Sequence, residues 1–210
     1  RTLSDVLEEN ERLQAQIDEL TVQLNHAKMD SYELENLGDL LELDEKYSTY
    51  EKIAASVIAK DSTNWFSTFT INRGSNHGLE PGMNVIAGSG LVGIITDVGP
   101  NYAKVRSIID DTSNLSGMFL RSEDTCIVSG NLQSINNGYI DISMISMNAE
   151  IEENAEIVTS HISDKYHQGI LVGYAVDIKT DSSNMAKEAK LIPAVDFEHL
   201  ETVLIITEPK

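Results

Sequence analysis

The feature that most constrains the fold is a change in hydrophobic period near Tyr50. From residue 3 to residue 41, apolar side chains recur in a heptad, which is typical of a helix that packs along a narrow seam. Beyond Tyr50, short β-branched runs alternate at a period of two, which is typical of strands. The sequence therefore predicts a long N-terminal helix followed by a mainly β region with almost no further helix.

The heptad offers six a positions and six d positions, and nine of these twelve residues are apolar. The a positions are Leu3, Asn10, Ile17, Leu24, Ser31 and Gly38, and the d positions are Val6, Leu13, Leu20, Ala27, Leu34 and Leu41. Asn10 at an a position favours a parallel pair of helices, because the two amides can satisfy each other across the seam. We predict that residues 1–50 form a coiled coil, helical to about Tyr47, that dimerises through Leu3, Val6, Asn10, Leu13, Ile17, Leu20 and Leu24. The alternative is a long helix that packs on its own domain.

Twelve short runs after Tyr50 have the composition of strands. They cover 54–60, 66–73, 83–87, 91–98, 103–109, 115–121, 125–130, 138–144, 156–159, 170–178, 188–195 and 202–207. Glycine, proline, asparagine and aspartate separate them, and these residues favour tight turns. The sequence thus predicts twelve strands.

Two of these runs repeat later in the chain. The segment 82–86 corresponds to 154–158 at an offset of 72 residues, and Leu91-Val92-Gly93 recurs as Leu171-Val172-Gly173 at an offset of 80. The second copy therefore carries an eight-residue insertion between its two strands, and the third and fourth strands match the ninth and tenth. Two related six-stranded barrels are the simplest architecture with this symmetry, because closure removes exposed strand edges.

The boundary between the barrels is open at this point. Taken in sequence order, residues 51–122 would form the first barrel and 123–210 the second. Alternatively, the C-terminal strands return to complete the first barrel, so that the second is an insertion.

The charge balance limits the partners. Fifteen Lys and Arg against 34 Asp and Glu leave a formal charge of −19, which argues against nucleic acid or anionic lipid as the main partner. No apolar run approaches the length of a membrane span. The chain starts at Arg1 with the helical pattern already under way, so we expect an upstream segment that this fragment lacks.

No pattern in the sequence predicts an active site, a metal site or a cofactor. The five histidines lack zinc spacing, and Cys126 is the single cysteine. Twin barrels also occur in chymotrypsin-like proteases, where a serine acts beside a histidine and an aspartate. The closest segment is Gly88-Ser89-Gly90, and no histidine in a compatible context precedes it. We therefore expect a protein that is not an enzyme.

Several residues of the β region have expected structural roles. Trp65 and Phe66 are adjacent, so alternation would send one into a barrel and the other to an end or an interface. Glycines in the turns and repeats are expected to serve backbone geometry, with positive φ at Gly78, Gly82 and Gly90. The full set is Trp65, Phe66, Gly74, Gly78, Gly82, Gly90, Gly93 and Gly173.

The ordered blocks of the β region resemble the bacterial cell-shape-determining MreC family. The resemblance extends from the coiled coil through the second repeat. The blocks that carry it are 57–61, 64–75, Gly78, 81–83, 90–93, 98–99 and 105–110. In the second repeat, the chain departs from the family pattern: His161 and His167 stand where the family usually has glycine and proline.

The resemblance implies a protein with a short cytoplasmic tail, one membrane span, and this coiled coil and both barrels on the extracytoplasmic side. It implies a non-catalytic scaffold of the machinery that inserts peptidoglycan during elongation and so maintains cell shape. The implied partners are a second copy of the chain, MreD, an elongation-specific class B penicillin-binding protein and, indirectly, the MreB filament. Two rival functions are a chymotrypsin-like hydrolase that uses the twin barrels and a cytosolic coiled-coil adaptor.

Overall fold

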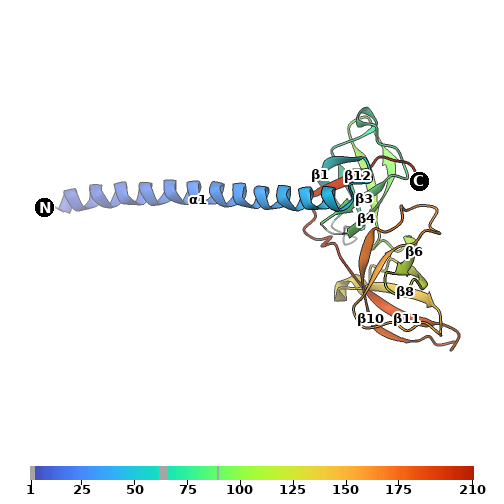
Figure 1. Ribbon diagram of the computed structural model, residues 1–210. Coiled ribbons are helices and arrows are strands. Elements are labelled where there is room, and N and C mark those ends of the chain that lie inside the picture. The colour runs from blue at the N-terminus through green and yellow to red at the C-terminus, as the bar shows by residue number, and fades with distance from the viewer. Residues whose placement is uncertain (1–2, 62–65, 89) are drawn as a thin grey trace. The chain divides into compact units, whose positions relative to one another are not determined.

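The computed structural model describes residues 3–61, 66–88 and 90–210 (Figure 1). The chain divides into two compact units. The first unit is Arg1–Leu41 and the second is Glu42–Lys210. The described residues of the first unit are helical, and the second unit contains the β region. Each unit is described here by itself.

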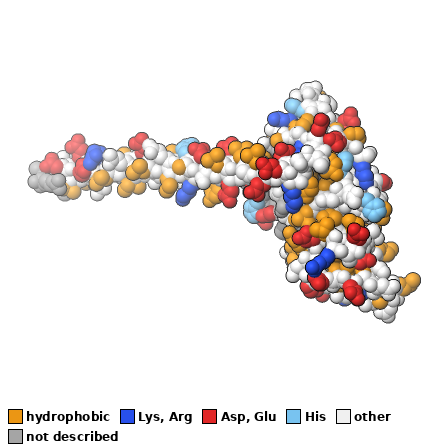
Figure 2. Space-filling view, viewed as in Figure 1, with side chains coloured by type: hydrophobic (Ala, Val, Ile, Leu, Met, Phe, Trp, Pro, Cys, Tyr) orange, Lys and Arg blue, Asp and Glu red, His pale blue; other side chains and the backbone are white. Residues whose placement is uncertain are grey.

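The helix α1 spans Leu3–Lys46, which confirms the long N-terminal helix. Hydrophobic and acidic side chains alternate along its surface (Figure 2). Short-range polar contacts stabilise it locally, such as the ion pair of 2.6 Å between Arg12 Nη2 and Glu9 Oε1. Within the described residues, no helix combines the length and the apolar composition that crossing a membrane requires.

The end of α1 belongs to the β unit. Leu43 is only 1% exposed, and Tyr47 is buried. The Lys52 ammonium donates hydrogen bonds to the carbonyls of Tyr47 at 2.6 Å and Tyr50 at 2.9 Å, and it pairs with Asp44 at 3.0 Å. A cation at this position satisfies carbonyls that a helix end leaves unpaired. The helix therefore stops where its apolar residues begin to pack on the barrels.

Among the described residues, twelve strands form two closed six-stranded barrels, as the sequence predicted. The first barrel contains β1 (Lys52–Lys60), β2 (Thr68–Ile71), β3 (Asn84–Ala87), β4 (Gly90–Val98), β5 (Ala103–Ser107) and β12 (Thr202–Ile206). The second contains β6 (Asn114–Phe119), β7 (Thr125–Ser129), β8 (Ile140–Ile145), β9 (Ala155–Thr159), β10 (Leu171–Thr180) and β11 (Lys187–Pro193). In the described part of the chain, the 3-10 turns Ser75–His77 and Ser134–Asn137 join strands.

The strand order contradicts the division of the β region at residues 122 and 123. β12 pairs with β1 and β3 and so closes the first barrel, whereas β6 pairs with β7 and β9 in the second. The topology matches the alternative arrangement, in which the C-terminal strand returns to the first barrel. The sequential division is wrong because each strand pairs with its neighbours in space. The order of the strands along the chain does not fix which strands become neighbours.

The internal repeat is confirmed down to the pairing register. In the first barrel, Val85 lies opposite Gly93 and Ile86 opposite Leu91, with a register shift between them. In the second, Ile157 lies opposite Gly173 and Val158 opposite Leu171, with the same shift. The order of neighbours around the two barrels is the same. β1 to β5 of the first barrel correspond to β7 to β11 of the second, and β12 of the first barrel takes the place that β6 has in the second.

The two barrel interiors are filled by aliphatic side chains, which the period of two directs inward. Val85 and Ile157 hold equivalent inward positions, and both are fully buried. β12 contributes four residues that are at most 6% exposed: Val203, Leu204, Ile205 and Ile206. Each barrel therefore has a core of its own, and the first depends on the last strand of the chain.

Candidate functional site

The predicted seam of α1 is exposed along the first unit. Val6 is 50% exposed, Leu13 46% and Ile17 55%, and Leu20 and Leu24 are similarly open. Asn10 is also exposed, and the side chain of Leu3 lies outside the described residues. Apolar residues in a heptad rarely stay in contact with water when a partner helix is available. The seam thus has the properties of an unpaired coiled-coil face, and dimerisation stays a prediction.

The histidines for which the structure gives contacts lack the geometry of a catalytic triad. His199 Nδ1 contacts Asp196 Oδ2 at 2.8 Å, which raises the pKa of His199 through that hydrogen bond, and both side chains are largely exposed. In His77, Nδ1 accepts the backbone N–H of Gly74 at 3.1 Å and so belongs to a turn. Ser89, the nearest match to a nucleophile loop, lies outside the described residues. The described residues bring no serine into contact with the His199–Asp196 pair.

The described residues provide neither a reactive cysteine nor a metal-binding cluster. Burial raises the pKa of the Cys126 thiol to about 12, so the thiol stays protonated near neutral pH and is a poor nucleophile. Within the described residues, no group of three or more His, Cys, Asp or Glu side chains has a geometry that could hold a metal ion. His161 is exposed on the loop after β9.

The glycines selected from the sequence fall into two classes. Gly78 and Gly82 have φ values of 81° and 94°, as predicted, and a side chain would be strained there. Gly93 and Gly173 are equivalent positions where backbone approaches closely: a Cβ atom would lie 2.0 Å from the Arg106 carbonyl oxygen in one barrel and 2.2 Å from that of Ile192 in the other.

Gly90 and Gly74 also serve close approach. The expectation of positive φ at Gly90 is wrong, because this residue is in β4 and is not among the positive-φ glycines. A Cβ atom at Gly90 would lie 2.9 Å from that of Ala194 and 3.0 Å from the Leu171 carbonyl oxygen, so its small size permits contact with the second barrel. At Gly74, the Gly99 carbonyl oxygen would be 2.2 Å away.

Phe66 differs from the prediction made for the Trp65–Phe66 pair. β2 begins at Thr68, so Phe66 lies in the preceding turn, where its φ is 58° and its ring is half-buried below the Lys60 ammonium at 5.0 Å. The alternation of a strand therefore does not decide its direction. Trp65 lies outside the described residues.

The barrels meet at a junction that the sequence did not reveal as a site. Asn84 on β3 is 1% exposed, and its side-chain amide contacts the loop between β9 and β10. Its Nδ2 donates to the Lys165 carbonyl at 2.8 Å, and its Oδ1 accepts the His167 N–H at 2.8 Å. The available signal was a polar residue at the head of the apolar run Val85-Ile86-Ala87.

Residues around the start and the end of the first barrel complete this junction. The ring of His167 lies 4.7 Å from that of Tyr50 between centroids, and its Nε2 forms a hydrogen bond of 2.9 Å with the Glu208 carbonyl. The Leu171 N–H donates to the Tyr47 hydroxyl at 3.1 Å. The insertion of the second repeat therefore holds the second barrel against the first barrel and against the residues that follow α1.

Replacing Asn84 by alanine should lower the free energy of unfolding by about 1–3 kcal/mol, because two part-buried backbone groups lose their partner. Urea denaturation of the purified chain measures this change. Glu156→Ala is the matched control, since Glu156 holds the same place in the second repeat and is exposed; it should change stability by less than about 0.5 kcal/mol. Equal losses in both variants would contradict the role of the Asn84 amide.

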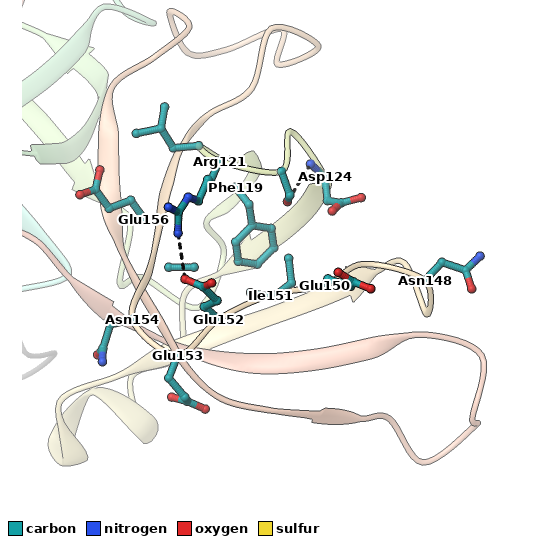
Figure 3. Close-up of a pocket in the computed structure, with 13 residues that line it drawn as sticks. Phe119, Arg121, Asp124, Asn148, Glu150, Ile151, Glu152, Glu153, Asn154 and Glu156 are labelled. Carbon is teal, nitrogen blue, oxygen red and sulfur yellow. Dashed lines mark hydrogen bonds and ion pairs between the residues drawn. The ribbon is translucent and has the colours of Figure 1, made fainter.

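A groove of about 840 Å³ opens on the second barrel between the β6–β7 hairpin and the segment before β9 (Figure 3). The buried ring of Phe119 lies at its floor. Its rim carries five carboxylates and one arginine. The lining residues are Phe119, Leu120, Arg121, Ser122, Asp124, Asn148, Glu150, Ile151, Glu152, Glu153, Asn154, Ala155 and Glu156. Arg121 Nη1 pairs with Glu152 Oε2 at 3.0 Å. The groove therefore combines apolar surface with excess negative charge.

Comparison with known proteins places the chain among shape-determining proteins. The family model described as "Rod shape-determining protein MreC, barrel core" matches residues 57–207. The cell shape-determining protein MreC of Listeria monocytogenes serovar 1/2a is 26% identical over 212 residues, which cover 97% of this chain and 70% of that protein.

Solved structures have the same fold. A structure described as MreC superposes with a TM-score of 0.77 at 21% identity and covers 84% of this chain and 98% of its own. A further match is to the "Complex between Penicillin-Binding Protein (PBP2) and MreC from Helicobacter pylori", with a TM-score of 0.57 at 14% identity over 75% of this chain and 100% of that one. At these identities the structures establish the fold.

Proposed function

The chain belongs to the MreC family of rod shape-determining proteins, and we propose that it acts as a non-catalytic extracytoplasmic scaffold for peptidoglycan synthases during cell elongation. In this function the barrels bind other proteins and carry out no reaction themselves. The observation that carries the proposal is the fold shared with an MreC that was solved in complex with a penicillin-binding protein.

The helix supports the dimeric part of this function. Its seam is apolar, regularly spaced and exposed, and charged and polar residues predominate on the rest of its surface. A parallel pair of such helices would present two copies of the barrel unit to partners, and we propose that a membrane span anchors them. MreD and, across the membrane, the MreB filament are the further partners that we propose for this assembly.

The barrel unit supports activation by binding. Its barrels are joined through Asn84 and the loop between β9 and β10, so a partner that contacts both would meet a defined surface. If the scaffold binds the active conformation of a partner more tightly than the inactive one, binding shifts the partner's conformational equilibrium towards the active state. The scaffold itself catalyses no reaction in this process. An elongation-specific class B penicillin-binding protein is the partner that we propose for this step.

A binding experiment with purified proteins tests this function. The extracytoplasmic region of the class B penicillin-binding protein from the same organism is immobilised, and the chain is passed over it; saturable binding is expected. A division-specific class B penicillin-binding protein is the matched control and should bind more weakly. Absence of saturable binding to the elongation protein, or stoichiometric labelling of the chain by a serine-hydrolase probe, would overturn the proposal.

A further inference from the structure

The groove on the second barrel, called here the acidic groove and lined by the thirteen residues given above, has a counterpart on the first barrel. The repeat offset of 72 residues makes Glu156 equivalent to Asn84 and Glu152 equivalent to Glu80. The pairing agrees, because Asn84 lies opposite Ile94 and Glu156 opposite Tyr174, and these partners differ by the offset of 80. The two barrels thus carry the same surface twice.

The two copies of this surface differ in exposure. On the first barrel, Asn84 is 1% exposed and its cross-strand neighbour Ile206 is fully buried. On the second barrel, Glu156 is exposed, and its neighbour Leu120, whose N–H donates to the Glu156 carbonyl, is 54% exposed. Since all four side chains sit at equivalent outward positions, the difference arises from what covers them.

A loop of the chain itself covers the first copy. The loop segment 165–168 crosses Asn84, which accepts the His167 N–H and donates to the Lys165 carbonyl. His167 also reaches the Glu208 carbonyl. This loop is the insertion that only the second repeat contains, so the chain has one such segment and two surfaces that could receive it. The surface on the second barrel is the open one.

We propose that the acidic groove binds an extended cationic segment of a partner protein, in the way that the first barrel holds its own loop. Where the first barrel has the side-chain amide of Asn84, the second barrel has the carboxylate of Glu156. A carboxylate only accepts hydrogen bonds, so Glu156 selects N–H groups and ammonium or guanidinium groups. Asp124, Glu150 and Glu153 add negative charge around it, and Leu120, which is 54% exposed, supplies apolar contact for the stem or for a neighbouring side chain.

The charges argue for another protein over a second copy of this chain. A second copy would have to bring a cationic segment to the groove although its own formal charge is −19, and the loop that would fill the groove already lies on its own first barrel. The Arg121–Glu152 pair is largely exposed, so a guanidinium or ammonium group of the partner can exchange with it at little cost. The inference is independent of which protein supplies the segment.

A pair of synthetic peptides tests this inference on the full chain. The probe is acetyl-Lys-Lys-Leu-Lys-Tyr-Gln-Gly-amide, and the matched peptide has glutamate in place of each lysine. Titration into the nitrogen-15-labelled chain is expected to shift the amide resonances of residues 119–124 and 148–156 with the lysine peptide alone. The shifts should decrease as salt is added, because exposed charges are screened.

Charge-neutral variants locate the binding. Glu150→Gln combined with Glu156→Gln should raise the Kd by about fivefold, since exposed ion pairs contribute modestly to binding. Glu80→Gln with Asp97→Asn is the matched control, because it removes the same charge from exposed positions of the first barrel; its Kd should be unchanged.

Three outcomes would overturn the inference. One is equal weakening in both double variants, which would indicate attraction to the overall negative charge. Another is the absence of shifts in the groove at millimolar peptide. The third is a shift of the same resonances with protein concentration alone, which would identify a second copy of the chain as the occupant.

Discussion

The double variant Leu13→Lys with Leu20→Lys is expected to convert a dimer of this chain into a monomer. Both residues are exposed d positions of the seam, and a parallel dimer would bury four leucines at these two layers. Their burial contributes roughly 6–12 kcal/mol at 1.5–3 kcal/mol per side chain. A micromolar dimer is held together by about 8 kcal/mol, so the loss is large enough to abolish association before the cost of burying lysine is counted.

Sedimentation equilibrium of the wild type and the variant measures this change. The matched control is Ala15→Lys with Val22→Lys, which adds the same charge on the face opposite the seam. This control should retain the concentration-dependent dimer. A wild-type chain that stays monomeric at high concentration, or a control that dissociates equally, would refute the seam.

Removal of β12 is expected to unfold the first barrel. Ending the chain at Leu200 deletes a strand that is hydrogen-bonded to both β1 and β3, and it exposes the interior of the barrel. The four buried residues of β12 correspond to roughly 6–12 kcal/mol of burial. Small domains have a total stability of about 5–15 kcal/mol, so the truncation removes most of what holds this barrel closed.

Thermal unfolding followed by near-ultraviolet circular dichroism, together with limited proteolysis, tests this expectation. The truncated chain should lose the cooperative transition of the first barrel and be cleaved in its strands. A chain that lacks only Pro209 and Lys210 is the control and should behave as the wild type. A truncated chain with an intact first barrel would show that β12 is dispensable for closure.

Removal of β12 should also affect the junction between the barrels. Tyr47 and Tyr50 follow α1 directly, and both contact residues of the second barrel through Leu171 and Gln168. The same region of the second barrel contacts Asn84 of the first. Loss of the first barrel should therefore also free the second barrel from the segment that links it to the helix.

Local patterns predicted much of this fold. The heptad identified α1 to within one residue of its C-terminal end, because the spacing of apolar residues is a local property of the chain. Alternation and turn residues predicted all twelve strands, although Phe66 was placed in a strand that begins at Thr68. The repeat matched the third and fourth strands with the ninth and tenth, and the structure shows that β3 with β4 and β9 with β10 share one pairing register.

Glycine roles were predicted where they depend on the turn itself. Gly78 and Gly82 have the positive φ expected of turn glycines. Gly90 was misjudged, because its requirement comes from Ala194 and Leu171, more than 80 residues away in the chain. A close approach between distant segments leaves no local pattern to recognise.

The sequence by itself thus determined the type and number of the elements and the match between repeated strands, because helix periodicity, strand alternation and turn chemistry act over a few residues. Only the tertiary structure decided that β12 closes the first barrel and β6 the second, since equivalent strands of a repeat have equivalent edges. It also decided that Asn84 is covered while Glu156 is open. That difference follows from where a single loop docks, a contact between segments about 80 residues apart that neither segment encodes alone.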